Sequence, residues 1–140
     1  MIVKQVRTLS ELNQLWPTLA PLLKKSFVRG TDNPGEVEDI HTMISQGRGN
    51  LFYVLEDDGS IPIAMALEAS VYKDTLRYIV VALGGVHLDK YYDAFWSDLC
   101  LWMRLQGAVS VEGLVKPGMQ RWLRKYKFEP VCMQMRLSLD

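Results

Sequence analysis

Apolar positions follow two different repeats along this chain, and the changes of repeat outline its expected elements. A period of two over residues 2–7 predicts a short strand. A helical spacing follows up to Phe27, with an apolar face of Leu9, Leu12, Leu15, Trp16, Leu19, Leu22 and Leu23. Pro17 and Pro21 lie within this pattern, and they predict either a kink or two short helices in succession.

A capping-box sequence marks the start of the first helix, because the Thr8 hydroxyl and the Glu11 carboxylate can each accept a hydrogen bond from an unpaired N–H group. Residues 33–35 read Asn-Pro-Gly and predict a loop. After the loop, the spacing of Val37, Ile40, Met43 and Ile44 predicts a second helix. Gly47 and Gly49 are placed to end it.

The middle of the chain predicts an antiparallel meander of three strands. Residues 51–56 and 61–72 are strand-like, and the Asp-Asp-Gly-Ser sequence at 57–60 is a strong hairpin signal between them. A short turn at 73–75 leads into an apolar strand at 76–83. The alternation over 61–72 puts Glu68 on one face together with small residues that could line a groove.

The second half predicts a helix, a strand, a helix and a closing strand. The first helix spans 89–106, and its inner face comprises Tyr92, Phe95, Trp96, Leu99, Trp102 and Met103. A strand at 108–115, a helix at 118–126 and an alternating strand at 131–139 complete the order β-α-α-β-β-β-α-β-α-β. No repeat or linker divides the chain, so we expect one α/β domain over residues 1–140.

Composition narrows the classes of partner. Sixteen basic and sixteen acidic residues cancel, so we expect neither nucleic acid nor a membrane surface as the partner. The apolar stretches are shorter than a membrane span, and the N-terminus lacks the layout of a signal peptide. Cys100 and Cys132 do not have the spacing of metal ligands, which favours two reduced thiols in the cytoplasm and no metal site.

One junction favours a phosphorylated ligand. The apolar strand stops at Gly84 and Gly85, and a helical repeat begins a few residues later. The free N–H groups at the start of that helix would then face back toward the end of the strand. Such a strand, glycine turn and helix can hold a phosphate group.

The element order resembles the GNAT acyltransferase superfamily over nearly the whole chain. The segments that carry the resemblance are Leu51-Phe-Tyr-Val-Leu-Glu-Asp-Asp-Gly-Ser60, the strand Tyr78-Ile-Val-Val-Ala82 and Trp122-Leu-Arg-Lys-Tyr-Lys-Phe128. The last looks like the family's leucine, lysine, glycine-phenylalanine helix end, with Lys127 in place of the glycine. Residues 116–122 resemble a phage-borne branch of the superfamily.

The resemblance implies that acetyl-CoA binds where the fourth and fifth strands part. Its pantetheine arm would pair with main-chain groups of the fourth strand, and its pyrophosphate would lie on the turn that follows. The implied cofactor-binding residues are Val81, Ala82, Leu83, Gly84, Gly85 and His87. The turn departs from the family's pattern because Asp89 is a carboxylate where a small residue is usual. Lys116 and Leu123 replace the usual asparagine and tyrosine.

Acyl transfer to an amine needs a base for the amine and an acid for the leaving thiolate. Glu68 is the candidate base and Tyr126 the candidate acid, with Glu112 as a second carboxylate. Each has a plainer alternative: a carboxylate on the solvated face of a sheet, or a tyrosine that packs in the core. His87 could titrate near neutral pH beside the cofactor turn or be an ordinary loop histidine.

Two charged groups could serve binding or simply face solvent. The basic set is Lys116, Arg121, Arg124, Lys125 and Lys127, and it could hold the 3′-phosphate of the coenzyme or an acidic partner. The acidic set is Asp32, Glu36, Glu38 and Asp39, around the helix that borders the acceptor site in this superfamily. An acidic rim would favour a cationic amine acceptor.

Two functions from different classes follow. The first is an acetyl-CoA-dependent N-acyltransferase that acts on an amine of a small molecule or a protein. The alternative is a catalytically degenerate GNAT-like protein of a phage, with a virion-associated, assembly or inhibitory role in the host cytoplasm or the virion. It would act through a protein partner or as a homo-oligomer, and its signature would be an exposed aromatic patch around Trp16 or Trp122.

Overall fold

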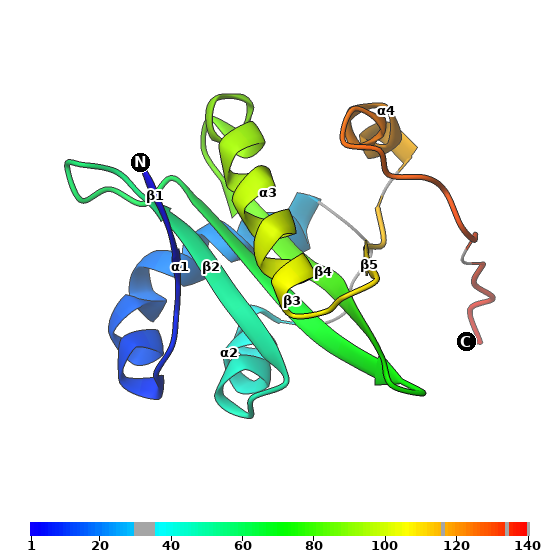
Figure 1. Ribbon diagram of the computed structural model, residues 1–140, viewed down its shortest axis with the longest axis horizontal. Coiled ribbons are helices and arrows are strands. Elements are labelled where there is room, and N and C mark those ends of the chain that lie inside the picture. Colours follow the sequence, from blue (N-terminus) through cyan, green and yellow to red (C-terminus); the bar gives the residue numbers. More distant parts are fainter. Residues whose placement is uncertain (30–35, 116, 134, 140) are drawn as a thin grey trace.

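The computed structural model describes residues 1–29, 36–115, 117–133 and 135–139. Its centre is a five-stranded sheet in the order β1-β2-β3-β4-β5 (Figure 1). The strands are β1 Ile2–Gln5, β2 Gly49–Leu55, β3 Ile63–Tyr72, β4 Thr75–Gly85 and β5 Ser110–Glu112. Neighbouring strands are antiparallel except β4 and β5, which are parallel. The sheet is therefore mixed, with its one parallel pair at the edge.

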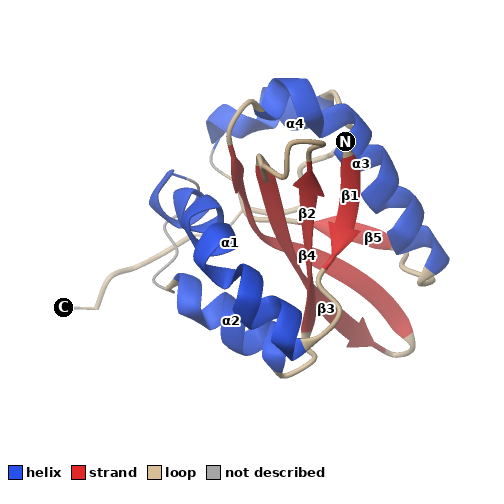
Figure 2. Ribbon diagram, turned by 90° about the vertical axis from the view of Figure 1, so that its left-hand side faces the viewer, coloured by secondary structure: helices blue, strands red, loops and turns tan. Residues whose placement is uncertain are grey.

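Helices cover both faces of the sheet (Figure 2). They are α1 Leu9–Arg29, α2 Val37–Ser45, α3 Leu88–Leu105 and α4 Gln120–Arg124, the last preceded by a 3₁₀ turn, Pro117–Met119. Helices α1 and α2 lie on one face and α3 lies on the other. Helix α3 is the crossover that a parallel pair of strands requires. The predicted mixed α/β fold is confirmed.

The alternation of β3 divides the core into two layers. Ala64 and Ala66 face α1 and α2, and the small side chains let these helices approach the sheet. Ile63, Met65 and Leu67 point the other way, toward the aromatic inner face of α3. The buried residues of α3 are Tyr91, Tyr92, Phe95, Trp96, Leu99 and Met103. The predicted face is confirmed with two differences: Tyr91 is added to it, and Trp102 is only partly buried against the same cluster.

Of the two outcomes that the prolines predicted for the first helix, a division into two short helices is not found. The two prolines do not divide it, and α1 is one helix from Leu9 to Arg29. Pro17 and Pro21 are both exposed, so water can satisfy the carbonyl groups that each proline leaves unpaired. The capping box is present in modified form: Oγ1 of Thr8 accepts from the Glu11 N–H at 3.1 Å, and the Glu11 carboxylate accepts from the Arg7 N–H at 3.3 Å.

The C-terminal third departs most from expectation. Strand β5 has three residues rather than the predicted span 108–115, and α4 has five residues rather than the span 118–126. The predicted strand at 131–139 is wrong: its described residues have no regular secondary structure and are exposed. Alternation shows that a segment could have an apolar face, but a strand also needs a neighbour for its backbone groups. The predicted loop at 33–35 lies outside the described residues.

Candidate functional site

The parallel strands β4 and β5 pair over a short stretch and then part. Their three pairs are Arg77 with Ser110, Tyr78 with Val111, and Ile79 with Glu112. Within the described chain, β4 continues from Val80 to Gly85 with no strand on that side. A Cβ atom on Gly113 would lie 3.8 Å from the Cβ of Val80, so the chain is still beside β4 at this residue although the strand pairing ends at Glu112. Among the described residues, no strand pairs with the backbone N–H and C=O groups along this edge of β4.

A β-bulge lies where the strands part. Ala66 pairs with Ala82 and Leu67 pairs with Val80, so Val81 is the extra residue on β4. Val81 and Ala82 therefore both contact the cluster on the α1 and α2 face, although neighbours in a regular strand point to opposite faces. The bulge changes the direction of the backbone groups next to the unpaired edge of β4.

Two carboxylates lie in one row across the sheet at the same level. Glu68 pairs with Ile79, and Ile79 pairs with Glu112, so all three side chains point to the face that carries α1 and α2. Two strand spacings place the Cα atoms of the two glutamates about 10 Å apart. Both side chains are partly exposed. The fold thus brings together the two carboxylates that the sequence offered as separate base candidates.

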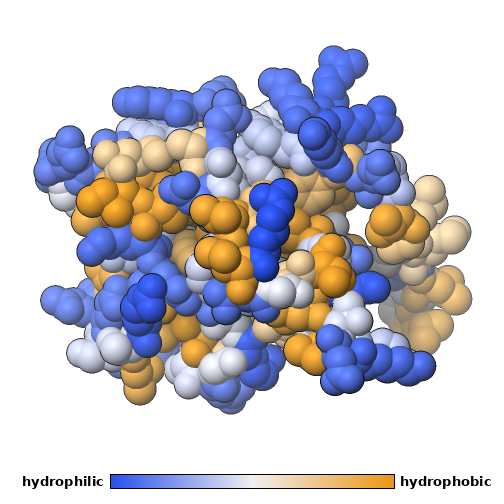
Figure 3. All heavy atoms as spheres, in the orientation of Figure 1, coloured by the Kyte–Doolittle hydropathy of each residue, from blue (hydrophilic) through white to orange (hydrophobic). Residues whose placement is uncertain are grey.

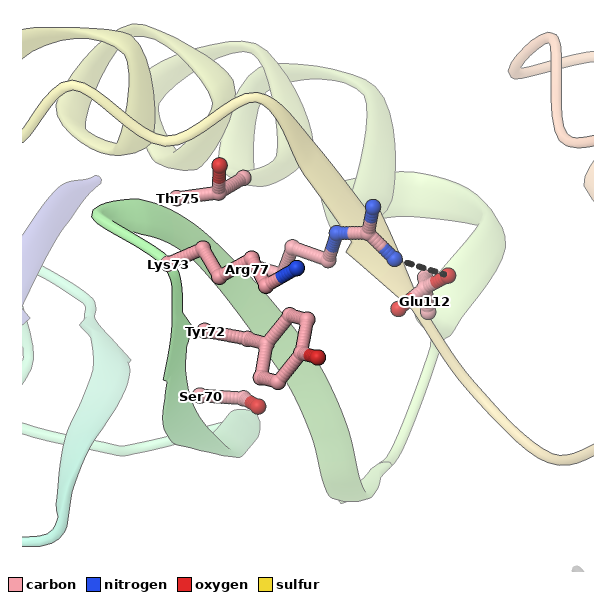
Figure 4. Close-up of a pocket in the computed structure, with 6 residues that line it drawn as sticks. All are labelled: Ser70, Tyr72, Lys73, Thr75, Arg77 and Glu112. Carbon is pink, nitrogen blue, oxygen red and sulfur yellow. Dashed lines mark ion pairs between the residues drawn. The ribbon is translucent and has the colours of Figure 1, made fainter.

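A polar depression of about 500 Å³ adjoins this row (Figure 4). It is lined by Ser70, Tyr72, Lys73, Thr75, Arg77 and Glu112. Nη1 of Arg77 lies 4.0 Å from Oε1 of Glu112, and both side chains remain about half exposed. Oγ of Ser110 is buried with no hydrogen-bond partner among the described residues. The depression combines two cations with a carboxylate, which suits a polar ligand.

The sequence pointed to Glu112 and to the face of Glu68, which includes Ser70 and Tyr72, but not to Lys73, Thr75 or Arg77 as lining residues. Ser70 and Arg77 form the row next to the two glutamates, since Ser70 pairs with Arg77 and Arg77 with Ser110. The available signal was the length of the β3–β4 hairpin, which alternates for ten residues on β3. Its outer half, from Glu68, carries polar residues on the face where Ala64 and Ala66 are covered by helices.

Helix α2 bounds the row of carboxylates on the other side. Gly49 pairs with Glu68, and a Cβ on Gly49 would lie 2.7 Å from the terminal methyl of Met43. The C-terminal half of α2 is thus next to Glu68. The acidic residues of α2 lie at its other end, where the Glu36 N–H donates to Oδ2 of Asp39 at 2.8 Å. Glu36 and Asp39 therefore cap the helix, and Asp32 lies outside the described residues.

The two glycines at the end of β4 have packing roles. A Cβ on Gly84 would lie 1.7 Å from the carbonyl oxygen of Leu22, so only glycine lets α1 cross the sheet at this point. A Cβ on Gly85 would lie 2.1 Å from the carbonyl oxygen of Pro62. The contact of α1 with β4 therefore accounts for Gly84 without a ligand.

The turn into α3 has an unusual backbone. His87 precedes the helix with φ of +54° and ψ of +45°, a left-handed conformation that costs free energy for a residue with a Cβ. Its side chain is exposed and makes no cap hydrogen bond. Asp89 lies in the first turn. Val86, His87, Asp89 and Lys90 are all exposed, so the N-terminus of α3 is accessible and contains charges of both signs.

Tyr126 lies on the α3 side of the sheet and not in the row of carboxylates. Its hydroxyl donates a 2.6 Å hydrogen bond to Oδ1 of Asp93. Its ring contacts Tyr92 and Trp122 at centroid distances of 4.7 and 5.2 Å. The hydrogen bond to Asp93, with a smaller contribution from burial, raises the pKa of Tyr126 to about 12. A phenol with this pKa gives up its proton less readily than an ordinary tyrosine.

The basic residues of the last helix face solvent. Arg121, Arg124, Lys125 and Lys127 are exposed, and Lys116 lies outside the described residues. No helix among the described residues is both long and apolar enough to cross a membrane. The same residues contain no group of three or more metal-binding side chains placed to hold an ion.

Comparison with known proteins finds likeness in structure. No protein-family model and no curated protein matches the sequence. Among solved structures, a soil-metagenome aminoglycoside acetyltransferase in complex with sisomicin aligns with a TM-score of 0.70, at 11% identity over 99% of this chain and 96% of that one. A second aminoglycoside acetyltransferase from such a sample gives 0.72, at 14% identity over 99% and 98% of the two chains.

A more distant source gives the same result. An acetyltransferase of Trypanosoma brucei aligns with a TM-score of 0.64, at 17% identity over 99% of this chain and all of that one. Identities this low establish similarity of architecture and do not transfer a substrate. The full-length alignments and the mixed sheet agree that this chain has the fold of the GNAT-type acetyltransferases.

Proposed function

We propose that the chain is an N-acyltransferase that moves an acetyl group from acetyl-CoA to an amine. The observation that carries the proposal is the parting of β4 and β5 after Ile79, with the bulge at Val81 and the carboxylates of Glu68 and Glu112 at the same level. The free edge of β4 then offers backbone groups for an amide-rich cofactor arm, and the neighbouring row of carboxylates offers a base.

The residues fit the two halves of the cofactor unequally. Backbone groups of Val81, Ala82 and Leu83 on the free edge of β4 would hold the pantetheine arm as a strand holds its neighbour. The N-terminus of α3 is accessible for the phosphates, but Asp89 in its first turn would repel them. When bound, acetyl-CoA supplies a thioester, which is an activated acyl group.

Glu68 is the proposed base, and Glu112 is its partner or substitute. An amine is protonated at neutral pH and must lose a proton before its nitrogen can attack a carbonyl carbon. The nitrogen then forms the new C–N bond, the C–S bond breaks, and the thiolate takes up a proton. We propose that this proton returns through Glu68 or a water, because the proton of Tyr126 is held by Asp93. Tyr126 stays a candidate that a substitution can test.

Titration with acetyl-CoA, followed by calorimetry, tests the proposal directly. We expect saturable binding in the micromolar to millimolar range, and no binding at millimolar cofactor would overturn the enzyme interpretation. Asp89→Asn should tighten the binding of acetyl-CoA about two- to fivefold, because it removes a negative charge that repels the phosphates. One charge at the start of a helix changes the free energy of such an interaction by about 0.3–1 kcal/mol. Acetyl-pantetheine, which lacks the phosphates of the coenzyme's nucleotide, is the matched ligand control. Its affinity should not respond to Asp89→Asn.

A non-catalytic GNAT-like protein, phage-borne or not, is the second candidate. It is favoured by Asp89, by the left-handed His87 and by the packing role of Gly84. Trp16 and Trp122 do not form the exposed patch that this alternative predicted, because both are half-buried within the fold. Failure of acetyl-CoA to bind to a folded protein would favour this candidate.

A further inference from the structure

The outer half of the β3–β4 hairpin combines opposite charges on one face of the sheet. Arg77 of β4 pairs with Ser110 of β5, one row away from the row that contains Glu68 and Glu112. Lys73 lies in the turn of the same hairpin and lines the same depression. Figure 3 shows hydrophilic side chains gathered at the lower right, over the tip of this hairpin in Figure 1. The depression is thus a charged surface next to the proposed base.

The ion pair in the depression is loose. Nη1 of Arg77 lies 4.0 Å from Oε1 of Glu112, and the two side chains are 54% and 41% exposed. This distance is longer than the hydrogen bonds of a close pair between an arginine and a carboxylate. Exposed ion pairs contribute little to stability. The pair can therefore open for a ligand at little cost to the fold.

Lys73 brings a second cation to the depression. Its Nζ lies 5.5 Å from the centroid of the Tyr72 ring. Figure 4 shows that the side chains of Lys73 and Arg77 extend in the same direction, toward Glu112. Asp74 follows Lys73 in the turn but is not among the residues that line the depression. Among the described residues, the lining thus contains two cations and one carboxylate.

The cations and the carboxylates form two neighbouring groups. Glu68 and Glu112 flank Ile79 in one row, and Arg77 and Lys73 lie toward the tip of the hairpin. A ligand that complements both groups has a cationic end and an anionic end close together. A polyamine has positive charges alone, so the two cations of the depression would repel it. An amine that also carries a carboxylate fits both groups.

We propose that the acceptor is a free amino acid, whose amine lies over Ile79 between Glu68 and Glu112 and whose carboxylate binds Arg77 and Lys73. This inference rests on the proposed transferase function and names its substrate class. Because the charges of Arg77 and Glu112 are close, the two charges of the ligand must be close as well, and an α-amino acid separates them by a single carbon atom. The planar guanidinium of Arg77 can donate two parallel hydrogen bonds to a carboxylate.

This placement brings the amine to the position where the reaction is proposed. The row of Ile79 is the last row in which β4 and β5 pair, and the free edge of β4 begins at Val80. Glu68 takes a proton from the ammonium group, and the neutral nitrogen forms a C–N bond to the acetyl group as the C–S bond breaks. The thiolate takes up a proton, so the products are an N-acetyl amino acid and coenzyme A, with one proton released overall. Acetylation removes the positive charge of the amine, which favours release from the carboxylates.

Matched acceptors test the substrate class. Each common amino acid other than cysteine is screened with acetyl-CoA by the release of free thiol. Each accepted amino acid is then compared with its primary amide, which keeps the amine and the side chain but lacks the negative charge. We expect kcat/KM to be at least about 10-fold higher for the acid, through its charge-assisted hydrogen bonds. The amine of the amide is the weaker base and is more often neutral, so its own reactivity would favour the amide.

Two results would overturn the inference. One is an equal kcat/KM for the acid and the amide, and the other is no transfer to any amino acid by a protein that binds acetyl-CoA. Spermidine, a cationic amine without a carboxylate, separates this failure from failure of the proposed function. If spermidine is acetylated and amino acids are not, the transferase function stands and the substrate class is wrong. A folded protein that does not bind acetyl-CoA would overturn both.

Arg77→Gln tests the contact with the carboxylate. It should raise KM for the accepted amino acid about 10-fold and change kcat less than about twofold, because Arg77 binds the substrate away from the reacting nitrogen. KM for the amide should not change, and Arg77→Lys should recover part of the affinity for the acid. Arg104→Gln is the matched control, since Arg104 is exposed on α3 at the other face of the sheet.

A binding measurement gives a second readout that does not require turnover. Calorimetry with coenzyme A present, which has no acetyl group to transfer, should show the amino acid binding about 10-fold more weakly to Arg77→Gln than to the parent chain. Circular dichroism confirms that each variant is folded. An unchanged preference for the acid over the amide in folded Arg77→Gln protein would refute the contact between Arg77 and the carboxylate.

Discussion

The hydroxyl of Tyr126 donates a 2.6 Å hydrogen bond to Oδ1 of Asp93. This contact joins the second residue after α4 to the second turn of α3, and it fixes the last helix on the aromatic side of the core. It also commits the proton of the tyrosine that the sequence offered as a catalytic acid. Both the position of α4 and the chemistry of Tyr126 can therefore be tested through one pair of residues.

Replacing Tyr126 by phenylalanine should lower the free energy of unfolding by about 1 kcal/mol, the net contribution of a typical hydrogen bond. A charged acceptor contributes more when it is buried, but this pair is partly exposed. The ring remains and keeps its contacts with Tyr92 and Trp122. Urea titration measures the change. Asp93→Asn should cost a similar amount, and the double variant should cost less than the sum of the two. Full additivity would show that the residues do not interact.

The same pair predicts a loss of stability in alkali. The pKa of Tyr126 is raised to about 12 in the folded chain, above about 10 for an unfolded tyrosine. The stabilisation is therefore complete below pH 10 and is lost as the pH rises toward 12. Tyr92, whose pKa burial also raises, contributes in the same direction. Between pH 9 and 12, the midpoint temperature of thermal unfolding should fall less steeply for Tyr126→Phe than for the parent chain.

Activity distinguishes the two roles proposed for Tyr126. If Asp93 holds its proton throughout the reaction, Tyr126→Phe should keep kcat within about threefold, since its effect is on stability alone. If the phenol protonates the thiolate, kcat should fall by about 10²-fold or more. Release of free thiol, followed with a disulfide reagent, measures the rate. Loss of activity in a folded Tyr126→Phe protein would restore the tyrosine as the acid.

The row of carboxylates predicts unequal effects of two matched substitutions. Glu68→Gln should reduce kcat by about 10²- to 10³-fold, as expected for removal of a general base, and the loss should shrink as the pH rises and more amine is neutral. Glu112→Gln should reduce kcat by a smaller factor, because Glu112 is also paired with Arg77. Glu129→Gln, exposed and remote from the row, is the control. Equal activity of all three proteins would remove Glu68 from the mechanism.

The contact between Gly84 and Leu22 predicts an intolerance that does not depend on a ligand. Gly84→Ala places a Cβ against a backbone carbonyl, so it should destabilise the fold by about 2–3 kcal/mol or more. Gly118→Ala is the matched control, since a Cβ there meets nothing within 4 Å, and it should stay within about 0.5 kcal/mol. Midpoints of urea unfolding compare them. If the Gly84→Ala protein is as stable as the parent, the packing of Leu22 does not explain the glycine. The remaining reason would be that glycine lets a phosphate group of the ligand approach the backbone.

Much of the fold could be predicted because its signals are local. Helix α3 buries the face that its helical spacing defined, and the β3 alternation separates Ile63, Met65 and Leu67 from Ala64 and Ala66 as expected. The hairpin between β2 and β3 also formed at its turn sequence, where Gly59 adopts φ of +87°. Each of these depends on residues within one or two turns of one another, so the sequence carries the information directly.

The site could be predicted only in part, because it depends on pairing between distant segments. Glu68 and Glu112 were each visible as candidates, but only the register through Ile79 places them in one row. Likewise, no local signal marks Val81 as the bulged residue, and nothing near Gly84 shows that the backbone of Leu22 lies against it. These facts arise from contacts between segments that are up to 62 residues apart, as Leu22 and Gly84 are.

By itself, the sequence determined which segments could be helices or strands, the order of those segments and the apolar face of each. The tertiary structure decided where the pairing of β4 and β5 ends, which carboxylates share a face and that the apolar residues of 131–139 that it describes are exposed. The physical reason is that periodicity is set by local backbone geometry, whereas register and strand partners are set by the burial that distant segments achieve together.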